Sequence, residues 1–389
     1  MKILILTFYY KPDLSAGSFR VTSIIESLIK KNKNIQLEVL TTIPNRYSNY
    51  KINAKSFESS DNLKIYRFKT IEHNSGFLKQ SLGFVKYSMF VLWHIKNNEY
   101  DLIFASSSRL MTAFLGVLIG KNKKTPIYID IRDIFYDTFK DLKKNYIISL
   151  FKPIFNKVEQ YTLTNSDKVN LVSKGFKEYF NEKYPKQNYT FLTNGIDEIF
   201  YDYKKLHKRI RKNNLLHVLY AGNIGEGQAL ETILPKLAVH FKNKVEFYLY
   251  GSGSTVNNLK AQIRENNIKN IFIKNPVNRE LLKVEYFNSD ILFLHLNDID
   301  AFKKVLPSKL FEYAATGKPI WAGVGGYAKI FINKEIHNAS LFDPCDVNSA
   351  VTAFNKINLS KTNRDEFCQK YSRKKISMEI SEEIIRMIN

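Results

Sequence analysis

The chain has 389 residues, enough for two domains of ordinary size, and 44% of them are hydrophobic. With 16 glycines and 10 prolines, the composition can bury large cores and excludes a fibrous or low-complexity protein. Its 59 lysines and arginines outnumber 37 acidic residues and give a net charge of +22, which favours an anionic partner: nucleic acid, anionic lipid or a phosphate-bearing small molecule.

The cysteines and apolar runs indicate the compartment. Cys345 and Cys368 match no metal-ligand spacing and no disulfide framework, so we expect a reducing cytoplasm. The N-terminal MKILILTFYY has the pattern of a first β-strand, not that of a signal peptide. The other apolar runs, such as Leu110–Gly120, are shorter than the ~20 residues that cross a bilayer, so no membrane span is expected.

The first half alternates short runs rich in β-branched residues with stretches of helical spacing. The predicted strands are Ile3–Phe8, Leu37–Leu40, Leu63–Phe68, Leu102–Ala105, Ile127–Ile131 and Val169–Val172. Helices predicted between them include Arg20–Lys30 and Met111–Gly120. This βαβ order predicts a parallel sheet.

The second half repeats the alternation after a polar stretch, 198–214, that we interpret as a linker. The predicted strands are Leu216–Tyr220, Val245–Tyr250, Ile271–Ile273, Ile291–Leu296, Ile320–Ala322 and Ser340–Phe342. The fold class is therefore α/β, with two Rossmann-like domains, 1–197 and 215–370. In such sheets ligands bind outside the carboxyl ends of the strands.

The segment Leu306–Ile320, LPSKLFEYAATGKPI, carries the clearest binding signal. Pro307 and Ser308 suit the start of a helix, where Ser can cap backbone donors and N–H groups attract phosphate. Lys309 adds a cation, and Glu312 lies one turn deeper, where it can accept hydrogen bonds from a sugar's hydroxyls. A capped surface helix with a Lys309–Glu312 pair is the alternative from spacing alone.

This segment resembles the donor-nucleotide helix of family-4 glycosyltransferases of the GT-B fold, particularly the bacterial polysaccharide enzymes that include N-acetylfucosaminyltransferases. Other segments resemble that family in order along the chain and so cover nearly all of it. They are YYKPDLSAGSFR (9–20), SDKVNLVS (166–173), LTNGID (192–197), AGNIGEGQALE (221–231), YGSG (250–253) and the stretch from Tyr371 onward.

The resemblance implies two domains facing across a cleft, a C-terminal helix at about 371–389 returning to the N-terminal domain, and transfer from a nucleotide diphosphate sugar with retention. It places the donor in the C-terminal domain, with Glu312 holding the ribose. The family's other glutamate would fall at Lys304, so Lys303, Lys304 or the backbone of Val305 and Leu306 would contact the donor sugar.

The same resemblance implies further donor contacts at Lys309, Asn223 and Gly251. The family's basic pair beneath the diphosphate would fall near Asn223 and Gln228, so it is missing here, and Lys309 with helix N-termini would stabilise the leaving group. Gly251 and Asn223 lie in turns that resemble donor-binding turns.

The loop after the first strand contains Gly17, Ser18 and Arg20. Backbone at this position passes close to whatever occupies the crevice, and the family match favours contact of the Gly17 and Ser18 amides with the donor. A simple turn is the alternative, and Arg20 would either add charge or cap the helix surface.

The segment IDIRDIF (129–135) ends a strand where many relatives carry a His near the reacting centre. This chain offers Arg132, which would contact a phosphate, and Asp133, which would orient or deprotonate the acceptor or hold the donor sugar. A structural salt bridge between the two is the alternative.

No metal or other cofactor is expected. Asp298-Ile299-Asp300 has the D-x-D form that binds a divalent metal in a different glycosyltransferase fold, but a solvated loop is favoured here. Gly251 and Gly253 give half of a dinucleotide fingerprint without its third glycine.

Two stretches combine lysines with bulky apolar residues, Phe77–Ile95 and Phe139–Phe155. Interfacial helices need this combination, so we predict peripheral contact with anionic lipid, although core-packed helices with solvated lysines are the alternative for either stretch alone. We expect a cytoplasmic protein on the inner face of the cell membrane.

The function predicted is a retaining glycosyltransferase that moves a sugar, a HexNAc or deoxy-HexNAc, from a UDP-sugar to a polyprenyl-linked saccharide in capsule or O-antigen synthesis. UDP and the lipid-linked acceptor come from the resemblance. A nucleotide-sugar 2-epimerase of the same fold, a catalytically inactive sugar-binding homologue and a basic nucleic-acid-binding protein remain open. No nucleic-acid module is apparent, so we expect no nucleic-acid partner.

Overall fold

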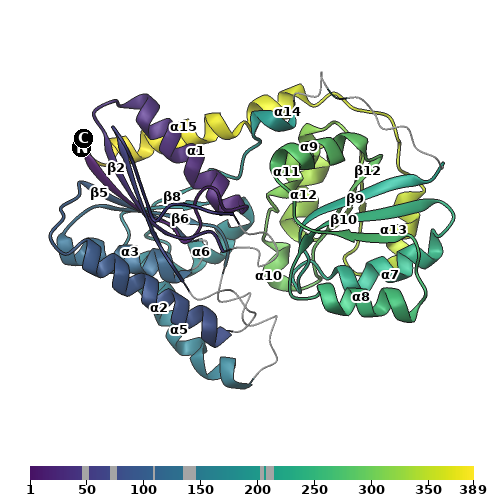
Figure 1. Cartoon of the computed structure of the whole chain (residues 1–389), viewed down its shortest axis with the longest axis horizontal. Helices are drawn as coiled ribbons and strands as arrows, with labels where there is room; N and C mark the ends of the chain where they lie inside the picture. The colour runs from purple at the N-terminus through teal and green to yellow at the C-terminus, as the bar shows by residue number, and fades with distance from the viewer. Residues whose placement is uncertain (46–51, 71–76, 108–109, 135–145, 202–205, 207–213) are drawn as a thin grey trace. The chain divides into compact units, whose positions relative to one another are not determined.

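The computed structural model describes residues 1–45, 52–70, 77–107, 110–134, 146–201, 206 and 214–389. The chain divides into two compact units, each with its own sheet of mainly parallel strands (Figure 1). The first unit comprises Met1–Asn194 and Arg373–Asn389, and the second comprises Gly195–Ser372. The second unit thus contains the described part of the 198–214 stretch.

The first unit is built on an eight-stranded sheet of order β3-β4-β2-β1-β5-β6-β7-β8. Its strands are β1 (Lys2–Leu6), β2 (Gln36–Thr42), β3 (Phe57–Ser60), β4 (Leu63–Phe68), β5 (Leu102–Ser107), β6 (Ile127–Ile131), β7 (Lys168–Leu171) and β8 (Tyr189–Thr190). All neighbours are parallel except β3 and β4. The order of the parallel strands reverses between β1 and β5, which is the switch point at which α/β sheets bind ligands.

Helices cover both faces of this sheet (Figure 1). One face carries α1 (Ala16–Lys31) and α15 (Arg373–Arg386), and the other carries α2 (Phe77–His94), α3 (Leu110–Lys123) and α5 (Tyr146–Thr164). The short η1 (Lys174–Phe176) and α6 (Lys177–Lys183) follow β7.

The C-terminal helix α15 completes the core of the first unit. Its buried isoleucines Ile376, Ile380 and Ile384 share one apolar cluster with α1. The Ser377 hydroxyl also donates to Ser23 Oγ on α1 at 2.8 Å. The predicted return of the C-terminal helix to the N-terminal domain is therefore confirmed.

The second unit contains a six-stranded parallel sheet of order β11-β10-β9-β12-β13-β14. Its strands are β9 (Leu216–Asn223), β10 (Val245–Ser252), β11 (Ile271–Lys274), β12 (Ile291–His295), β13 (Ile320–Gly323) and β14 (Ala339–Phe342). Numbered from β9, this is the 3-2-1-4-5-6 order of a dinucleotide-binding sheet, with its switch point between β9 and β12.

Two apolar clusters fix the helices of the second unit on its sheet. One cluster includes α9 (Arg279–Asn288), α11 (Lys309–Ala315), α12 (Gly326–Glu335) and α14 (Asp365–Lys370), with η2 (Glu198–Phe200). The other includes α7 (Leu230–His240), α8 (Val256–Glu265) and α13 (Val347–Phe354). The remaining short helix, α10 (Asp300–Lys303), precedes α11.

All twelve predicted strands correspond to observed strands, several of them one to three residues longer than expected. The sequence did not indicate β3 or β8. The first, FESS, is short and polar and pairs only at the sheet edge, and the second has two residues. Neither has the apolar run or alternation by which a strand is recognised in sequence.

Candidate functional site

The carboxyl ends of β9 and β12 form the candidate donor site in the second unit. The loop after β9 is joined to the end of β12 by side-chain and backbone hydrogen bonds. His295 Nδ1 donates to the Gln228 carbonyl at 2.7 Å, and the Asn297 amide nitrogen donates to the Gly227 carbonyl at 3.0 Å. These bonds fix the backbone at the switch point, where the order of the strands reverses.

Lys309 begins α11 and its side chain reaches back to the end of β9. Its Nζ donates to Tyr220 Oη at 2.5 Å and lies 3.9 Å from the centroid of that ring. Burial lowers the pKa of Lys309 to about 7, and the Glu312 carboxylate partly opposes that shift. An anion arriving here would favour the charged form of this amine.

Two glycines make room for this arrangement. Gly222 has a φ of 135°, in the range that only glycine adopts readily, and a Cβ on it would stand 2.8 Å from Lys309 Nζ. Gly251 is the register partner of Gly222, and a Cβ there would stand 1.9 Å from the Gly222 carbonyl oxygen. Gly251, predicted to bind the donor, thus has a packing role beneath Gly222.

Ser308 was expected to cap α11, and this expectation is wrong. The helix does begin next to it, but Ser308 has a helical backbone conformation and its side chain makes no capping hydrogen bond. A residue that is already helical holds its hydroxyl away from the amides that a cap would satisfy. The half-buried side chain of Ser308 remains at the start of the helix that carries Lys309 and Glu312.

Glu312 lies on α11 one turn after Ser308, as predicted, and the neighbouring helix α9 holds its carboxylate. Tyr286 Oη on α9 donates to Oε2 at 3.1 Å, and Arg279 Nη2 lies 3.9 Å from Oε1. Arg279 also pairs with Asp197 and stacks over the Phe200 ring. The Glu312 side chain is 15% exposed, so it is oriented without being closed off.

The residues between α10 and α11 contribute mainly backbone. Leu306 is buried and Val305 half-buried, while Lys304 directly follows α10 as its C-cap. Next to them, α12 begins at Gly326, which has a φ of 53° and whose Cβ would stand 2.1 Å from the Lys303 carbonyl oxygen. The amides at the start of α12 lie beyond the end of β13 and were not singled out from sequence. A Gly-Gly pair between a strand and a helix was the available signal.

Asn223 and Gln228 occupy the positions where a basic pair was expected and is missing. They bond to each other: Asn223 Nδ2 donates to Gln228 Oε1 at 2.8 Å. The Asn223 carbonyl accepts from Tyr220 Oη at 2.5 Å. Lys309, from a different element, is the cation that reaches this end of β9.

In the first unit, the loop after β1 leads into α1. Ser15 caps the helix by accepting from the Ser18 amide at 3.1 Å, so that amide already has a partner within the unit. Gly17 and the Ser18 side chain are buried at the same turn.

Arg20 has a structural role, which corrects the prediction of a donor contact or a surface cap. It is 2% exposed and donates from Nε and Nη2 to both Asp130 oxygens at 2.9 Å. It also donates to the backbone carbonyls of Leu192 and Thr193. Asn170 completes the group by donating to Asp130 at 2.8 Å. This network joins α1, β6 and the stretch at Leu192 and Thr193, close to where the first segment of the unit ends.

Arg132 and Asp133 follow β6 directly. The Arg132 amide donates to Ser107 Oγ at 3.1 Å, and its Nη1 lies 3.3 Å from the Ala16 carbonyl, to which it donates. Burial lowers the pKa of Arg132 to about 10, while the negative charges of Asp130 and Asp133 oppose the shift. Asp133 itself is exposed. The two residues are thus brought together beside the start of α1.

The D-x-D segment lies partly in an exposed loop, as predicted for Asp298, but Asp300 begins α10, and both carboxylates form ion pairs with one lysine. Lys303 Nζ lies 3.1 Å from Asp300 Oδ1 and 3.7 Å from Asp298 Oδ1. Within the described ranges, His, Cys, Asp and Glu side chains form no group of three or more suited to a metal ion. The same ranges contain no helix with the length and apolar character needed to span a bilayer.

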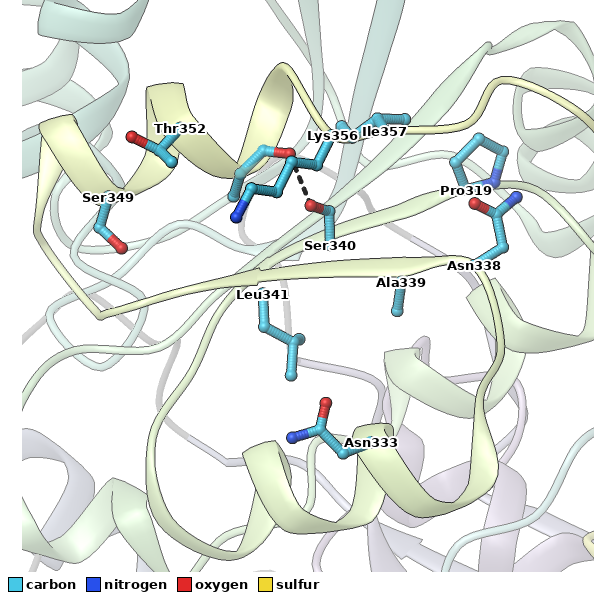
Figure 2. A pocket seen from close by; sticks show the side chains of 11 residues that line it. Pro319, Asn333, Asn338, Ala339, Ser340, Leu341, Ser349, Thr352, Lys356 and Ile357 are labelled. Atoms are coloured by element: carbon cyan, nitrogen blue, oxygen red, sulfur yellow. Dashed lines mark hydrogen bonds between the residues drawn. The ribbon is translucent and has the colours of Figure 1, made fainter.

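A separate pocket of about 530 Å³ lies beside the edge strand β14 (Figure 2). Its lining combines Ala339 and Leu341 of β14 with Asn333 of α12 and Thr352 of α13, and Ser340 Oγ is bonded to the Ala353 carbonyl. It extends toward the amino ends of β13 and β14, at Pro319 and Asn338 among others, so it is distinct from the switch point.

Comparison with known proteins agrees with this geometry. Residues 202–375 match the family described as "Glycosyl transferases group 1". This match covers most of the second unit, which contains Lys309 and Glu312. No curated protein sequence matches the chain significantly.

Solved structures of similar fold extend over the whole chain. Sucrose-phosphate synthase from Thermosynechococcus elongatus has a TM-score of 0.77 at 14% identity and covers 100% of this chain and 99% of its own. HepE from Anabaena in complex with UDP has a TM-score of 0.63 at 16% identity and covers 99% of this chain and 100% of its own. WaaG, a glycosyltransferase involved in lipopolysaccharide biosynthesis, has a TM-score of 0.65 at 11% identity and covers 98% of this chain and 95% of its own.

At these identities the structural likeness shows the fold, which confirms the predicted α/β chain of the GT-B fold. The group 1 match over residues 202–375 bears out the prediction of an enzyme of the hexosyltransferase class. The narrower likeness to N-acetylfucosaminyltransferases is not established by either comparison.

Proposed function

We propose that the chain is a retaining glycosyltransferase that moves a sugar, an N-acetylhexosamine or its deoxy derivative, from a UDP-sugar to a polyprenyl-linked saccharide in bacterial capsule or O-antigen assembly. The observation that carries the donor part is the pair formed by Lys309 and Glu312 on α11. The amine lies at the end of β9, and the carboxylate lies one turn along the helix, held by Tyr286.

The amine of Lys309 suits the diphosphate. A half-buried cation close to Gly222 provides a positive charge where water is partly excluded, and charge developing on a leaving diphosphate is stabilised most in such a place. The amides that begin α12 supply further donors at the neighbouring strand end. The proposed site binds the leaving group without a metal ion. Lys309 and the α12 amides take the place of the missing basic pair.

The carboxylate of Glu312 suits the ribose. Its oxygens can accept hydrogen bonds from two vicinal hydroxyls, and its orientation is set in advance by Tyr286 and Arg279. A carboxylate already held in place loses little conformational entropy when the donor binds. Val305 and Leu306 are proposed to contact the donor sugar through their backbone, because Lys304 replaces the carboxylate that relatives use.

Asp133 is proposed to act on the acceptor. It is exposed at the end of β6, where a carboxylate can orient or deprotonate a sugar hydroxyl, and Arg132 beside it offers a cation. Gly17 is proposed to approach the donor through its backbone. Arg20 is left out of the proposed site because its donors are used inside the first unit.

Two comparisons support the identity of the donor and acceptor. HepE is described in complex with UDP, and WaaG is described as acting in lipopolysaccharide biosynthesis. By analogy of fold, we propose UDP as the donor nucleotide and a lipid-linked saccharide as the acceptor. Such an acceptor places the protein at the inner face of the cell membrane.

A panel of UDP-, GDP- and dTDP-sugars tests this function. We expect thermal stabilisation and slow donor hydrolysis with UDP-sugars, and transfer once a lipid-linked or short-chain saccharide is added. Formation of an epimerised free sugar without any acceptor would instead identify the 2-epimerase. A protein that no nucleotide sugar stabilises would contradict the proposal.

A further inference from the structure

The outer face of α2 is an exposed apolar stripe. Its five large hydrophobic residues are all at least half exposed: Trp93 is 76% exposed, Met89 57%, Leu82 55%, Val85 51% and Leu92 50%. Leu82, Val85, Met89 and Leu92 follow one another at intervals of three or four residues, and Trp93 is next to Leu92. This spacing places all five on one side of the helix. Soluble surfaces seldom concentrate large apolar side chains in this way unless the patch binds something.

The opposite side of α2 accounts for its packing in the fold. Phe84, Tyr87, Val91 and Ile95 are buried, and Tyr87 Oη donates to the Leu40 carbonyl on β2 at 2.7 Å. The helix is thus already anchored to the first unit through one face. The exposed stripe is not needed to hold α2 in place, so it is available to a partner.

The charge on this side of the first unit is strongly one-sided. α2, α3 and α5 lie on the same face of the sheet (Figure 1) and together contain six lysines and one acidic residue. The acidic residue, Glu159, is buried and accepts hydrogen bonds from Tyr179 and Tyr184. Lys86, next to Val85 in the sequence, is exposed. Exposed charge on these helices is therefore positive.

We infer that the α2 stripe, defined as Leu82, Val85, Met89, Leu92 and Trp93, is the surface by which the protein docks on an anionic lipid bilayer. Large apolar side chains insert shallowly among acyl chains, while surrounding lysines meet the headgroups. Trp93 suits the boundary because its ring combines an apolar body with an N–H donor. The inference rests on the proposed function in one respect, since a lipid-linked acceptor requires access to a membrane.

A second copy of the chain is the competing occupant, and the charge argues against it. A symmetric dimer through α2 would bring two lysine-bearing surfaces together, because the same helices would face each other. Like charges facing across an interface are unfavourable, whereas an anionic bilayer is complementary to them.

Other parts of the predicted membrane region lie outside the described residues. These are 135–145 and the side chains of residues 77–80 and 146–151. Within the described part of α5, Ile154 is 55% exposed and Lys157 is exposed, which extends the same combination of apolar and basic side chains to a second helix.

The two tryptophans of the chain provide a direct test. Trp93 is exposed and Trp321 is fully buried, so only Trp93 can change its surroundings when the surface docks. With vesicles of mixed anionic and zwitterionic lipid at low salt, we expect the emission to move to shorter wavelength. The shift should be absent with Trp93→Phe, although that variant should still float with the vesicles because it keeps an apolar ring.

A matched pair of variants tests the whole stripe in flotation. Met89→Ser with Leu92→Ser should weaken vesicle binding by about tenfold or more and lose the Trp93 shift. The control, Val239→Ser with Ile330→Ser, removes two apolar residues of similar exposure, 54% and 63%, from the second unit and should bind as the wild type does. Raised salt should weaken binding of both the wild type and the control.

Three results would overturn the inference: no flotation and no emission shift for the wild type, equal flotation of the stripe variant and the control, or self-association without vesicles that the stripe variant abolishes. UDP-sugar binding, measured separately by thermal shift, should be the same in all these variants. A wild-type protein that binds UDP-sugars but no vesicles would therefore count against the docking surface alone. One that binds vesicles through the stripe but no UDP-sugar would count against the proposed function alone.

Discussion

The half-buried amine of Lys309 predicts a particular dependence of donor affinity on pH. Its pKa in the free protein is about 7, lowered by burial, and a bound diphosphate should raise it again because the negative charge favours the ammonium. Donor binding would then take up a proton. Affinity should be high when the amine is already charged, below the free-protein pKa, and should fall as pH rises above it.

The size of this effect follows from the fraction of protonated amine. With a pKa of about 7, about three-quarters of the amine is charged at about pH 6.5 and about 3% at about pH 8.5. If the bound form stays charged throughout, the affinity for a UDP-sugar should weaken by about 25-fold over this range, or about 1.9 kcal/mol. The diphosphate of a UDP-sugar does not titrate here, so the change belongs to the protein.

Isothermal titration with a UDP-sugar at several pH values, in buffers of different ionisation heat, measures both affinity and proton uptake. Lys309→Met should bind weakly at every pH and take up no proton, because it lacks the amine but keeps an unbranched side chain. Lys236→Met, which removes an exposed lysine on α7, is the control. A flat wild-type profile, or wild-type affinity in Lys309→Met, would refute the reasoning.

Four shorter predictions accompany it. Glu312→Gln should weaken UDP binding by about 1.5 to 3 kcal/mol without lowering the melting temperature, since Tyr286 can still bond to the amide oxygen; unchanged affinity would exclude a ribose contact. Asp133→Asn should reduce transfer by about a hundredfold or more at near-normal UDP affinity in a coupled assay, and normal turnover would remove it from the mechanism. Arg20→Met should lower the free energy of unfolding of the first unit by about 3 to 5 kcal/mol, because Asp130 stays buried without its partner, and a denaturant midpoint like that of the wild type would contradict this. Excess EDTA should leave transfer unchanged, whereas loss of activity restored by a divalent cation would show that a metal is needed.

Sequence reasoning recovered the strands well because buried parallel strands leave continuous apolar runs. It placed Ile127–Ile131 and Leu63–Phe68 with the observed ends. It also placed Lys309 and Glu312 on one helix, since a helix of this kind is a local feature with its own start and stop signals.

The partners of those residues could not be predicted, because they depend on contacts between distant parts of the chain. Tyr220 is 89 positions from Lys309, and Tyr286 is 26 positions from Glu312. Arg20 shows the opposite error: a charged residue near a predicted ligand loop was given a ligand, although its partner was Asp130, 110 positions away. Asp130 lies inside the predicted strand Ile127–Ile131, and nothing in the sequence indicated that its carboxylate would be buried and would need a cation.

The central claim is that the diphosphate of a UDP-sugar binds at the carboxyl end of β9 in the second unit. A crystal structure of the protein with UDP tests it most directly. We expect the phosphates within hydrogen-bond distance of Lys309 Nζ and the ribose hydroxyls on the Glu312 carboxylate. UDP bound away from α11, with Lys309 still on Tyr220 and Glu312 contacting no ligand, would contradict the account.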